Sequence, residues 1–237
     1  MNNVPLIISI LLGLATVLTI ILFYKASNYS KTTLLILSLW IALQTVISIT
    51  GFYTVTDITP PRFLLLVLPP LLCIIVLFIL PKGRAYLDSL QIKYLTILHI
   101  IRIPVEVTLL SLFIYKTIPG LMTFEGRNFD ILSGLTAPLI YYYYFIRKRL
   151  SHIVLLAWNL ICLGLLINIV VNAILSAPFP FQQFAFDQPN IALLYFPFVW
   201  LPCCIVPLVL LSHLVSIRQL LHRVSEQRLN TDVKVIQ

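Results

Sequence analysis

Charged residues are scarce in this sequence. Only 10% of the 237 residues are charged and 60% are hydrophobic, whereas charged residues make up about a quarter of a typical soluble domain. Because so few charges cannot cover the surface of a soluble protein, the composition excludes an ordinary soluble domain. It indicates a protein that lies within a lipid bilayer, and the bilayer is the first partner we expect.

Sequence motifs of known chemistry are also missing. The chain contains no HExxH zinc-protease helix, no GxSxG nucleophile elbow, no P-loop and no dinucleotide-binding fingerprint. It lacks the HxxxH pair that multipass hydrolases related to ceramidases need, and its last apolar run has no lysine for a retinal Schiff base. We therefore expect no metal site and no retinal, and whether the protein is an enzyme stays uncertain.

The chain does contain seven apolar runs, each close to the length of about 20 residues that a helix needs to cross a bilayer. They predict an all-α, polytopic membrane protein whose seven transmembrane helices form one bundle over residues 1–217, followed by a basic cytoplasmic tail over residues 218–237. The predicted spans are about 4–24, 33–54, 62–81, 95–116, 130–146, 153–176 and 191–217.

Basic residues fall mainly on one side of this topology. The formal net charge is +8, and the positive-inside rule then places the N-terminus outside and the C-terminus in the cytoplasm. Because topology explains the basic excess, we expect no nucleic-acid partner. The cytoplasmic set is Lys25, Lys31, Lys82, Arg84, Lys93, Arg147, Lys148, Arg149, Arg218, Arg223, Arg228 and Lys234, and the outer set is Arg62, Lys116 and Arg127.

Ionisable residues occur inside the fourth span. His99, Arg102 and Glu106 are spaced i, i+3, i+7, so they share one helix face, and Pro104 lies between them. Such residues are expensive in a bilayer and face the bundle interior, where they mark pathways. We predict that Glu106 is a protonatable switch with Arg102 as its partner, unless the two form an ion pair that only fixes packing. The full predicted polar track is His99, Arg102, Glu106, Asn168, Asn172 and His213.

A second group of polar residues precedes the fifth and seventh spans on the outer side. It can form a ligand or cation site, or it can cap the helices, with Arg127 pairing with Glu125. The members of this outer-mouth cluster are Glu125, Arg127, Asn128, Asp130, Asp187 and Asn190.

These observations leave three functions open. The first is small-solute or proton transport, or ligand binding, along the polar track. The second is a membrane-embedded enzyme that uses Glu125 or Asp130 as acid or base on a lipid or headgroup substrate, with Arg127 holding an anionic group. The third is a structural or assembly partner of another membrane protein. The cofactor is unknown, a haem between His99 and His213 is one option, and the oligomeric state is open.

Three segments carry a resemblance to a known kind of protein: Arg102–Glu106, Met122–Asp130 and Phe186–Pro197. They resemble segments of an uncharacterised family of small polytopic, seven-span bacterial membrane proteins with no assigned activity. The resemblance implies a multi-pass protein of the bacterial inner (plasma) membrane. It implies no catalytic or binding residue.

Overall fold

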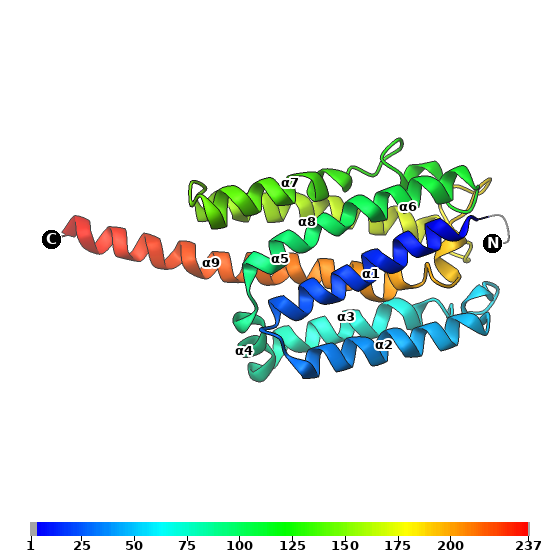
Figure 1. Cartoon of the computed structure of the whole chain (residues 1–237), viewed down its shortest axis with the longest axis horizontal. Coiled ribbons are helices and arrows are strands. Elements are labelled where there is room, and N and C mark those ends of the chain that lie inside the picture. Colours follow the sequence, from blue (N-terminus) through cyan, green and yellow to red (C-terminus); the bar gives the residue numbers. More distant parts are fainter. Residues whose placement is uncertain (1–3, 237) are drawn as a thin grey trace.

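The computed structural model describes residues 4–236, with side chains to residue 225, and its regular structure is helical throughout (Figure 1). No strand occurs between residues 4 and 236, so the prediction of an all-α fold is confirmed. The helices are α1 (Leu6–Ala26), α2 (Lys31–Ile49), α3 (Leu64–Ile79), α4 (Pro81–Ser89), α5 (Ile92–Leu98), α6 (Arg102–Ile114), α7 (Ile131–Tyr141), α8 (His152–Leu175) and α9 (Val206–Ile236).

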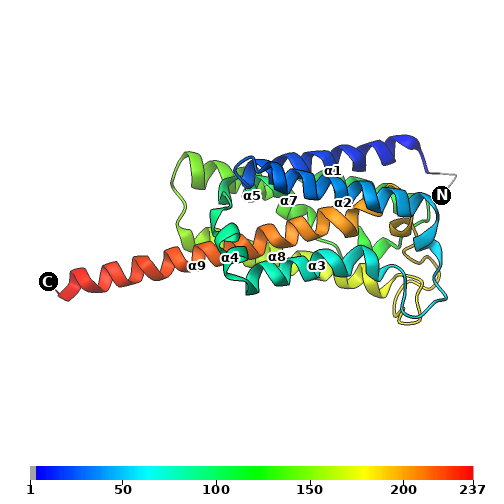
Figure 2. The same cartoon turned by 90° about the horizontal axis from the view of Figure 1, so that it is seen from below.

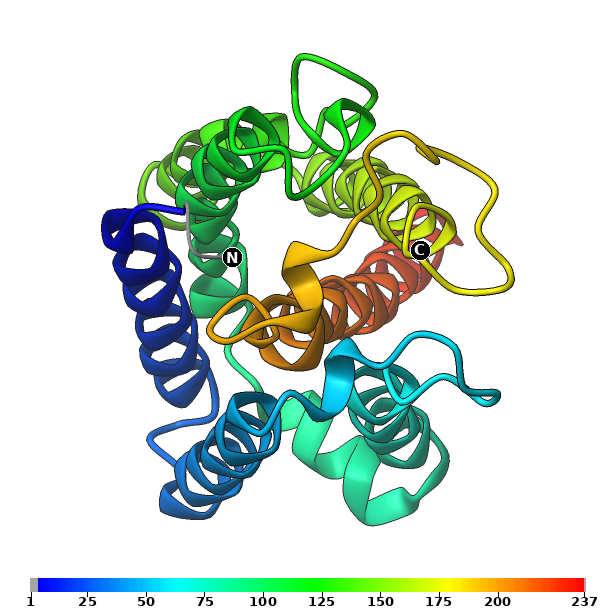
Figure 3. The ribbon, with the colours of Figure 1, turned by 90° about the vertical axis from the view of Figure 1, so that its right-hand side faces the viewer.

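The long helices run side by side along the longest dimension of the molecule (Figures 1 and 2). The N-terminus and the loops 50–63, 115–130 and 176–200 lie at one end of the bundle, and α4, the loop 147–151 and the C-terminal end of α9 lie at the other. Viewed along the bundle, α9 lies inside the ring of the other helices (Figure 3). Burial agrees with this position: 72% of the apolar stretch in Leu201–Ser225, which includes the first part of α9, is buried, compared with 11% of the apolar stretch in α2.

Several helices have the length and composition to cross a membrane. Five segments meet both requirements, or six if α3 and α4, which are bent by 97° at their junction, count as one. The segment Ile131–Ile146 is apolar but shorter. The five long segments are Leu6–Ala26, Lys31–Ile49, Ile92–Ile114, His152–Leu175 and Leu201–Ser225.

The predicted fourth span is a helix with a change of winding in it. A 3-10 turn over His99–Ile101 joins α5 to α6. Pro104 lies just beyond this turn and has no N–H to donate to the carbonyl of Ile100, so the regular α-helical bonding is interrupted there. A tighter turn accommodates that interruption. The change of winding lies beside the polar face that this segment presents.

Helix α4 is an element that hydropathy did not predict. The backbone of Leu80 is extended, and Pro81 then occupies the first turn of α4, where a missing N–H is tolerated. The bend brings Gly83 against the preceding turn of α3: a Cβ at residue 83 would lie 2.4 Å from the carbonyl oxygen of Leu77. Only glycine allows this approach without a shift of the backbone.

Contacts from α9 hold α4 in place. Arg218 pairs with the Asp88 carboxylate at 2.8 Å, and the Gln219 amide donates to the carbonyls of Leu87 and Leu90 at 2.9 Å each. The hydrogen bonds from Arg218 lower the pKa of Asp88 below its ordinary value. Helix α9 continues without a break past residue 217, where the last predicted span ends and the predicted tail begins. The side chains of Arg228 and Lys234, and residue 237 of the predicted tail, lie outside the described part of the chain.

We expect Gly83→Ala to destabilise the protein by about 1–3 kcal/mol, because the new methyl group overlaps backbone that cannot move alone. Gly164→Ala is the matched control, since a Cβ at that helical position meets no atom within 4 Å. Thermal unfolding of both variants in mild detergent checks this. Equal melting temperatures would show that the close contact of α4 with α3 is not needed.

Candidate functional site

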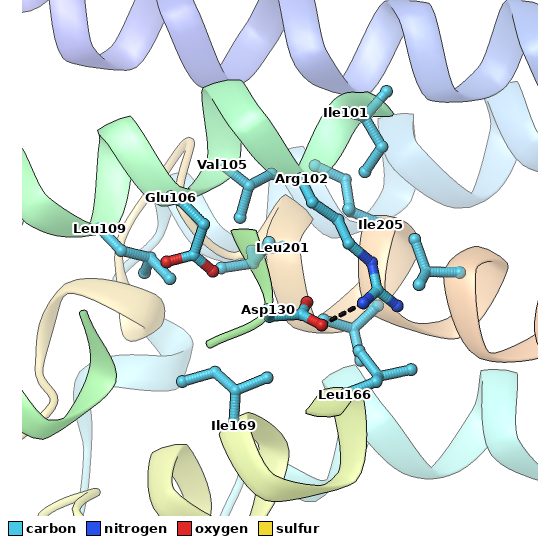
Figure 4. A pocket seen from close by; sticks show the side chains of 12 residues that line it. Ile101, Arg102, Val105, Glu106, Leu109, Asp130, Leu166, Ile169, Leu201 and Ile205 are labelled. Carbon is cyan, nitrogen blue, oxygen red and sulfur yellow. Dashed lines mark hydrogen bonds and ion pairs between the residues drawn. The ribbon is translucent and has the colours of Figure 1, made fainter. Parts of the chain in front are cut away.

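Four helices bring ionisable and amide side chains together in the interior of the bundle. Arg102 and Glu106 extend from α6, and Asp130 lies at the start of α7 (Figure 4). Asn159 comes from α8 and His213 from α9. All five side chains are buried, with residue exposures of 0–5%. We call these five residues the buried polar cluster.

The centre of the buried polar cluster is an ion pair between Arg102 and Asp130. Asp130 is held by residues on both sides of it in sequence: its backbone N–H donates to the Asn128 side-chain oxygen at 3.0 Å, and the Ser133 hydroxyl of α7 donates to its carboxylate at 3.4 Å. The anionic partner of Arg102 is thus a residue 28 positions away in sequence. The Arg102–Glu106 ion pair considered from the sequence is not the pair that forms.

Arg102 also determines the protonation pattern of His213. Its guanidinium lies 2.9 Å from the Nε2 atom of His213, and since arginine can only donate, Nε2 must accept. The other ring nitrogen, Nδ1, then carries the proton and donates to the Asn159 oxygen at 2.9 Å. The Asn159 amide in turn donates to the Leu155 carbonyl at 2.9 Å. The donor and the acceptor of these three hydrogen bonds are thereby assigned, whereas the Nε atom of Arg102 is buried without a partner among the described residues.

His99 lies against His213 but outside the hydrogen-bonded chain. The two rings stack with centroids 3.9 Å apart and an interplanar angle of 13°, and Trp158 packs edge-on against His99 at 5.5 Å. Two histidines that ligate one haem must approach its iron from opposite faces of the macrocycle. Stacked rings at this spacing leave no room for it, so the haem hypothesis does not fit this pair.

Glu106 is bound on one side only. Its Oε1 atom accepts from the Asn128 amide at 2.6 Å, whereas its Oε2 atom is buried and has no hydrogen-bond partner among the described residues. The side chain borders a cavity of about 40 Å³, which Arg102 and Asp130 also line (Figure 4). A water-sized site needs about 10–15 Å³ by this measure, so the cavity has room for water beside the carboxylate.

The asparagines predicted for the polar track lie elsewhere. Asn168 is exposed and donates to the Arg127 carbonyl at 2.8 Å, while Asn172 donates to the carbonyl of Asn168 at 2.9 Å. Asn168 therefore joins α8 to the loop 115–130, Asn172 bonds within α8, and neither forms a hydrogen bond with His213. The asparagine that does so is Asn159, which was not among the residues predicted for the polar track. The signal that could have identified Asn159 is its position on the buried face of α8. That face consists of Leu155, Asn159, Cys162, Leu166, Ile169 and Asn172.

The structure also divides the predicted outer-mouth cluster. Asn128 and Asp130 are buried and belong to the interior network, whereas Glu125, Arg127 and Asp187 are exposed. Asn190 is buried separately and donates to the Ala173 carbonyl at 3.0 Å. No group of three or more metal-ligating side chains of the His, Cys, Asp and Glu types occurs within the described residues.

Fold and site define the class of protein: an all-helical chain with several long apolar helices and a charged cluster buried between them. Residues 60–221 match the family described as "Domain of unknown function (DUF8737)", and the chain belongs to this family. The match begins before α3 and ends within α9, so it contains the whole buried polar cluster. No curated protein and no solved structure matches the chain.

We expect that removing either partner of the Arg102–Asp130 ion pair destabilises the protein by about 3–5 kcal/mol, because the other charge is left buried and unpaired. Arg102→Met and Asp130→Leu are the single variants, and the double variant should lose clearly less than their sum, since it leaves no isolated charge. Unfolding in mild detergent measures all three. Additive losses would show that the two charges do not interact.

Proposed function

We propose that the protein is an integral membrane protein that crosses the bilayer seven times, with the N-terminus outside and residues 218–237 in the cytoplasm. Five long apolar segments, α3 of the bent α3–α4 unit and the apolar segment Ile131–Ile146 supply the seven spans. The last of these is 16 residues long and covers about 24 Å as a helix, which is short of a hydrocarbon core of about 30 Å. Local thinning of the bilayer accommodates such a difference. The resemblance noted above supports a bacterial inner membrane.

Charge distribution supports this orientation. The loops 27–30 and 147–151, helix α4 and the distal part of α9 lie at one end of the bundle (Figures 1 and 2). These segments contain or adjoin most of the lysines and arginines of the chain. Basic residues concentrate on the cytoplasmic side of membrane proteins. Helix α4 then lies along the cytoplasmic surface of the bilayer.

The activity that the geometry supports best is proton binding and transfer within the membrane, with Glu106 as the group that takes up and releases the proton. One observation carries this proposal: the Oε2 atom of Glu106 is buried without a hydrogen-bond partner among the described residues, and the Glu106 side chain lines the cavity. Asp130 already neutralises Arg102, so Glu106 has no cation dedicated to it. A proton is the simplest species that can neutralise this carboxylate.

The size of the cavity separates protons from larger solutes. Pockets for small molecules have volumes of about 300–1,000 Å³, whereas this cavity has about 40 Å³. Water fits and an organic solute does not. Protons would exchange between water in the cavity and the Oε2 atom of Glu106. During this exchange Arg102 and Asp130 would keep their charges, and His213 would keep the proton on Nδ1. Asn128 donates to the other carboxylate oxygen of Glu106, Oε1. Its loop, 115–130, lies at the same end of the bundle as the N-terminus.

An enzyme at the outer face has less support. Asp130, one of its two candidate acids, is buried and engaged by Arg102. The other candidate, Glu125, and the proposed anion-binding Arg127 are exposed in the loop. In that alternative Glu125→Ala would be the severe change and Glu106→Gln the mild one.

We expect Glu106→Gln to abolish proton movement through the purified protein in liposomes that contain a pH-sensitive dye. The amide of glutamine keeps the shape of the side chain and does not take up or release a proton near neutral pH. Glu125→Gln is the matched control, because it makes the same chemical change at an exposed position of the adjoining loop and should leave the flux unchanged. Unfolding curves of both variants verify that they are folded.

Two results would contradict the proposal. One is a proton flux in the folded Glu106→Gln variant equal to that of the unaltered protein. The other is the absence of any flux with the unaltered protein under an imposed pH gradient and membrane potential. Either result would favour a structural or assembly role for the buried polar cluster.

A further inference from the structure

A second, much larger hollow lies between α2, α3 and the start of α9. Its volume is about 490 Å³, within the range of about 300–1,000 Å³ of small-molecule sites. Buried side chains of Cys203, Cys204 and Leu208 form its floor. Its rims carry exposed residues, Ile36 on α2 and Cys73 on α3. We call it the α2–α3 groove, and the exposed rims show that it opens at the side of the bundle.

The α2–α3 groove is apolar along its length and polar at one end. Its lining includes Ser30, Thr32 and Thr33 around the start of α2, together with Tyr86 of α4, whose hydroxyl lies 3.1 Å from that of Thr33. Farther along α2 the lining is apolar as far as Trp40. Trp40 is ten residues after Ser30, which corresponds to about 15 Å of helix. Such a shape suits a hydrocarbon chain that carries a polar head.

Positive charge surrounds the polar end. Lys31 is the first residue of α2 and lies between the lining residues Ser30 and Thr32. Lys82 and Arg84 precede Tyr86 on α4. All three basic residues are exposed. Arg218, also nearby through its contact with α4, is already paired with Asp88. Exposed lysines and arginines at a membrane surface attract anionic headgroups, each by about 1 kcal/mol.

Trp40 and Cys203 limit the apolar end. The indole N–H of Trp40 donates to the carbonyl of Cys203 at 2.8 Å, which ties α2 to the π-helical segment Leu201–Ile205 directly before α9. Pro69 and Pro70 of α3 line the opposite wall. These residues bring no charge into the groove, so its interior can accept hydrocarbon without a desolvated ion.

We propose that the α2–α3 groove binds one acyl chain of an anionic phospholipid, with the phosphate at the Ser30–Thr33 turn and α4. The chain lies along α2 toward Trp40, and Lys31, Lys82 and Arg84 select the negative headgroup. The proposal rests on the membrane embedding proposed above and is independent of proton binding at Glu106. It assigns α4 a role, which is to present basic and hydroxyl side chains to the headgroup.

Cys73 is a native probe of occupancy, because it is exposed on the groove rim while Cys162, Cys203 and Cys204 are buried. The purified full chain in dodecyl maltoside micelles is mixed with phosphatidylglycerol or phosphatidylcholine and treated with N-ethylmaleimide. Intact-mass spectrometry follows the single adduct. We expect phosphatidylglycerol to slow alkylation about tenfold more than phosphatidylcholine does, which corresponds to about 1.4 kcal/mol of selectivity.

Charge variants test the headgroup contact. Lys82→Gln with Arg84→Gln should remove most of the difference between the two lipids and leave only the part due to Lys31. Lys148→Gln with Arg149→Gln is the matched control, because it removes the same two charges from the loop between α7 and α8, and it should retain the difference. Equal protection by the two lipids in the unaltered protein, or the same response of both double variants, would overturn the proposal.

A second measurement tests the chain contact. Ile74 is 7% exposed and lines the α2–α3 groove, whereas Ile75 is 52% exposed and does not. Ile74→Trp fills the hollow and should lower the phosphatidylglycerol retained after purification about tenfold relative to Ile75→Trp, as measured by lipid mass spectrometry. Equal retention by two folded variants would place the lipid elsewhere. Because no proton flux is measured, failure here leaves the role of Glu106 untouched.

Discussion

The ion pair between Arg102 and Asp130 is the interaction on which the interior of this bundle depends. A guanidinium in an apolar core needs a full negative charge and partners for its remaining N–H groups. Asp130 provides the charge from the start of α7, and His213 provides an acceptor from α9. Through His213 the requirement extends to Asn159 on α8. One buried cation thereby sets how α6, α7, α8 and α9 face one another.

Close backbone packing makes that arrangement possible. A Cβ at Gly134 of α7 would lie 2.9 Å from the Ile103 side chain and 3.3 Å from that of Arg102. The small residue lets α7 approach α6 at the level of the ion pair, as small residues do between helices in membranes. Because Arg102 pairs with Asp130, Glu106 is left without a cation. The packing of α6 on α7 and the proposed proton chemistry therefore both depend on this ion pair.

Hydropathy predicted the all-helical character of the fold, although residues 191–199 of the seventh apolar run contain one short 3-10 turn and no α-helix. The i, i+3, i+7 spacing correctly identified His99, Arg102 and Glu106 as interior residues. Partner assignments were less successful. Asp130 was expected at the outer mouth and pairs with Arg102, while Asn168 was expected inside and is exposed. Spacing along one helix reports which face is buried, but it does not report which helix lies opposite.

The sequence by itself determined the local properties of this protein: which stretches are helical, which faces are buried and where basic residues concentrate. These depend on residues within one or two turns of each other. Tertiary structure decided the rest. The bonds of Arg102 to Asp130 and His213 join residues 28 and 111 positions apart. The α2–α3 groove likewise arises only when separate helices pack, because pairing across a bundle depends on helix orientation, which no single segment contains.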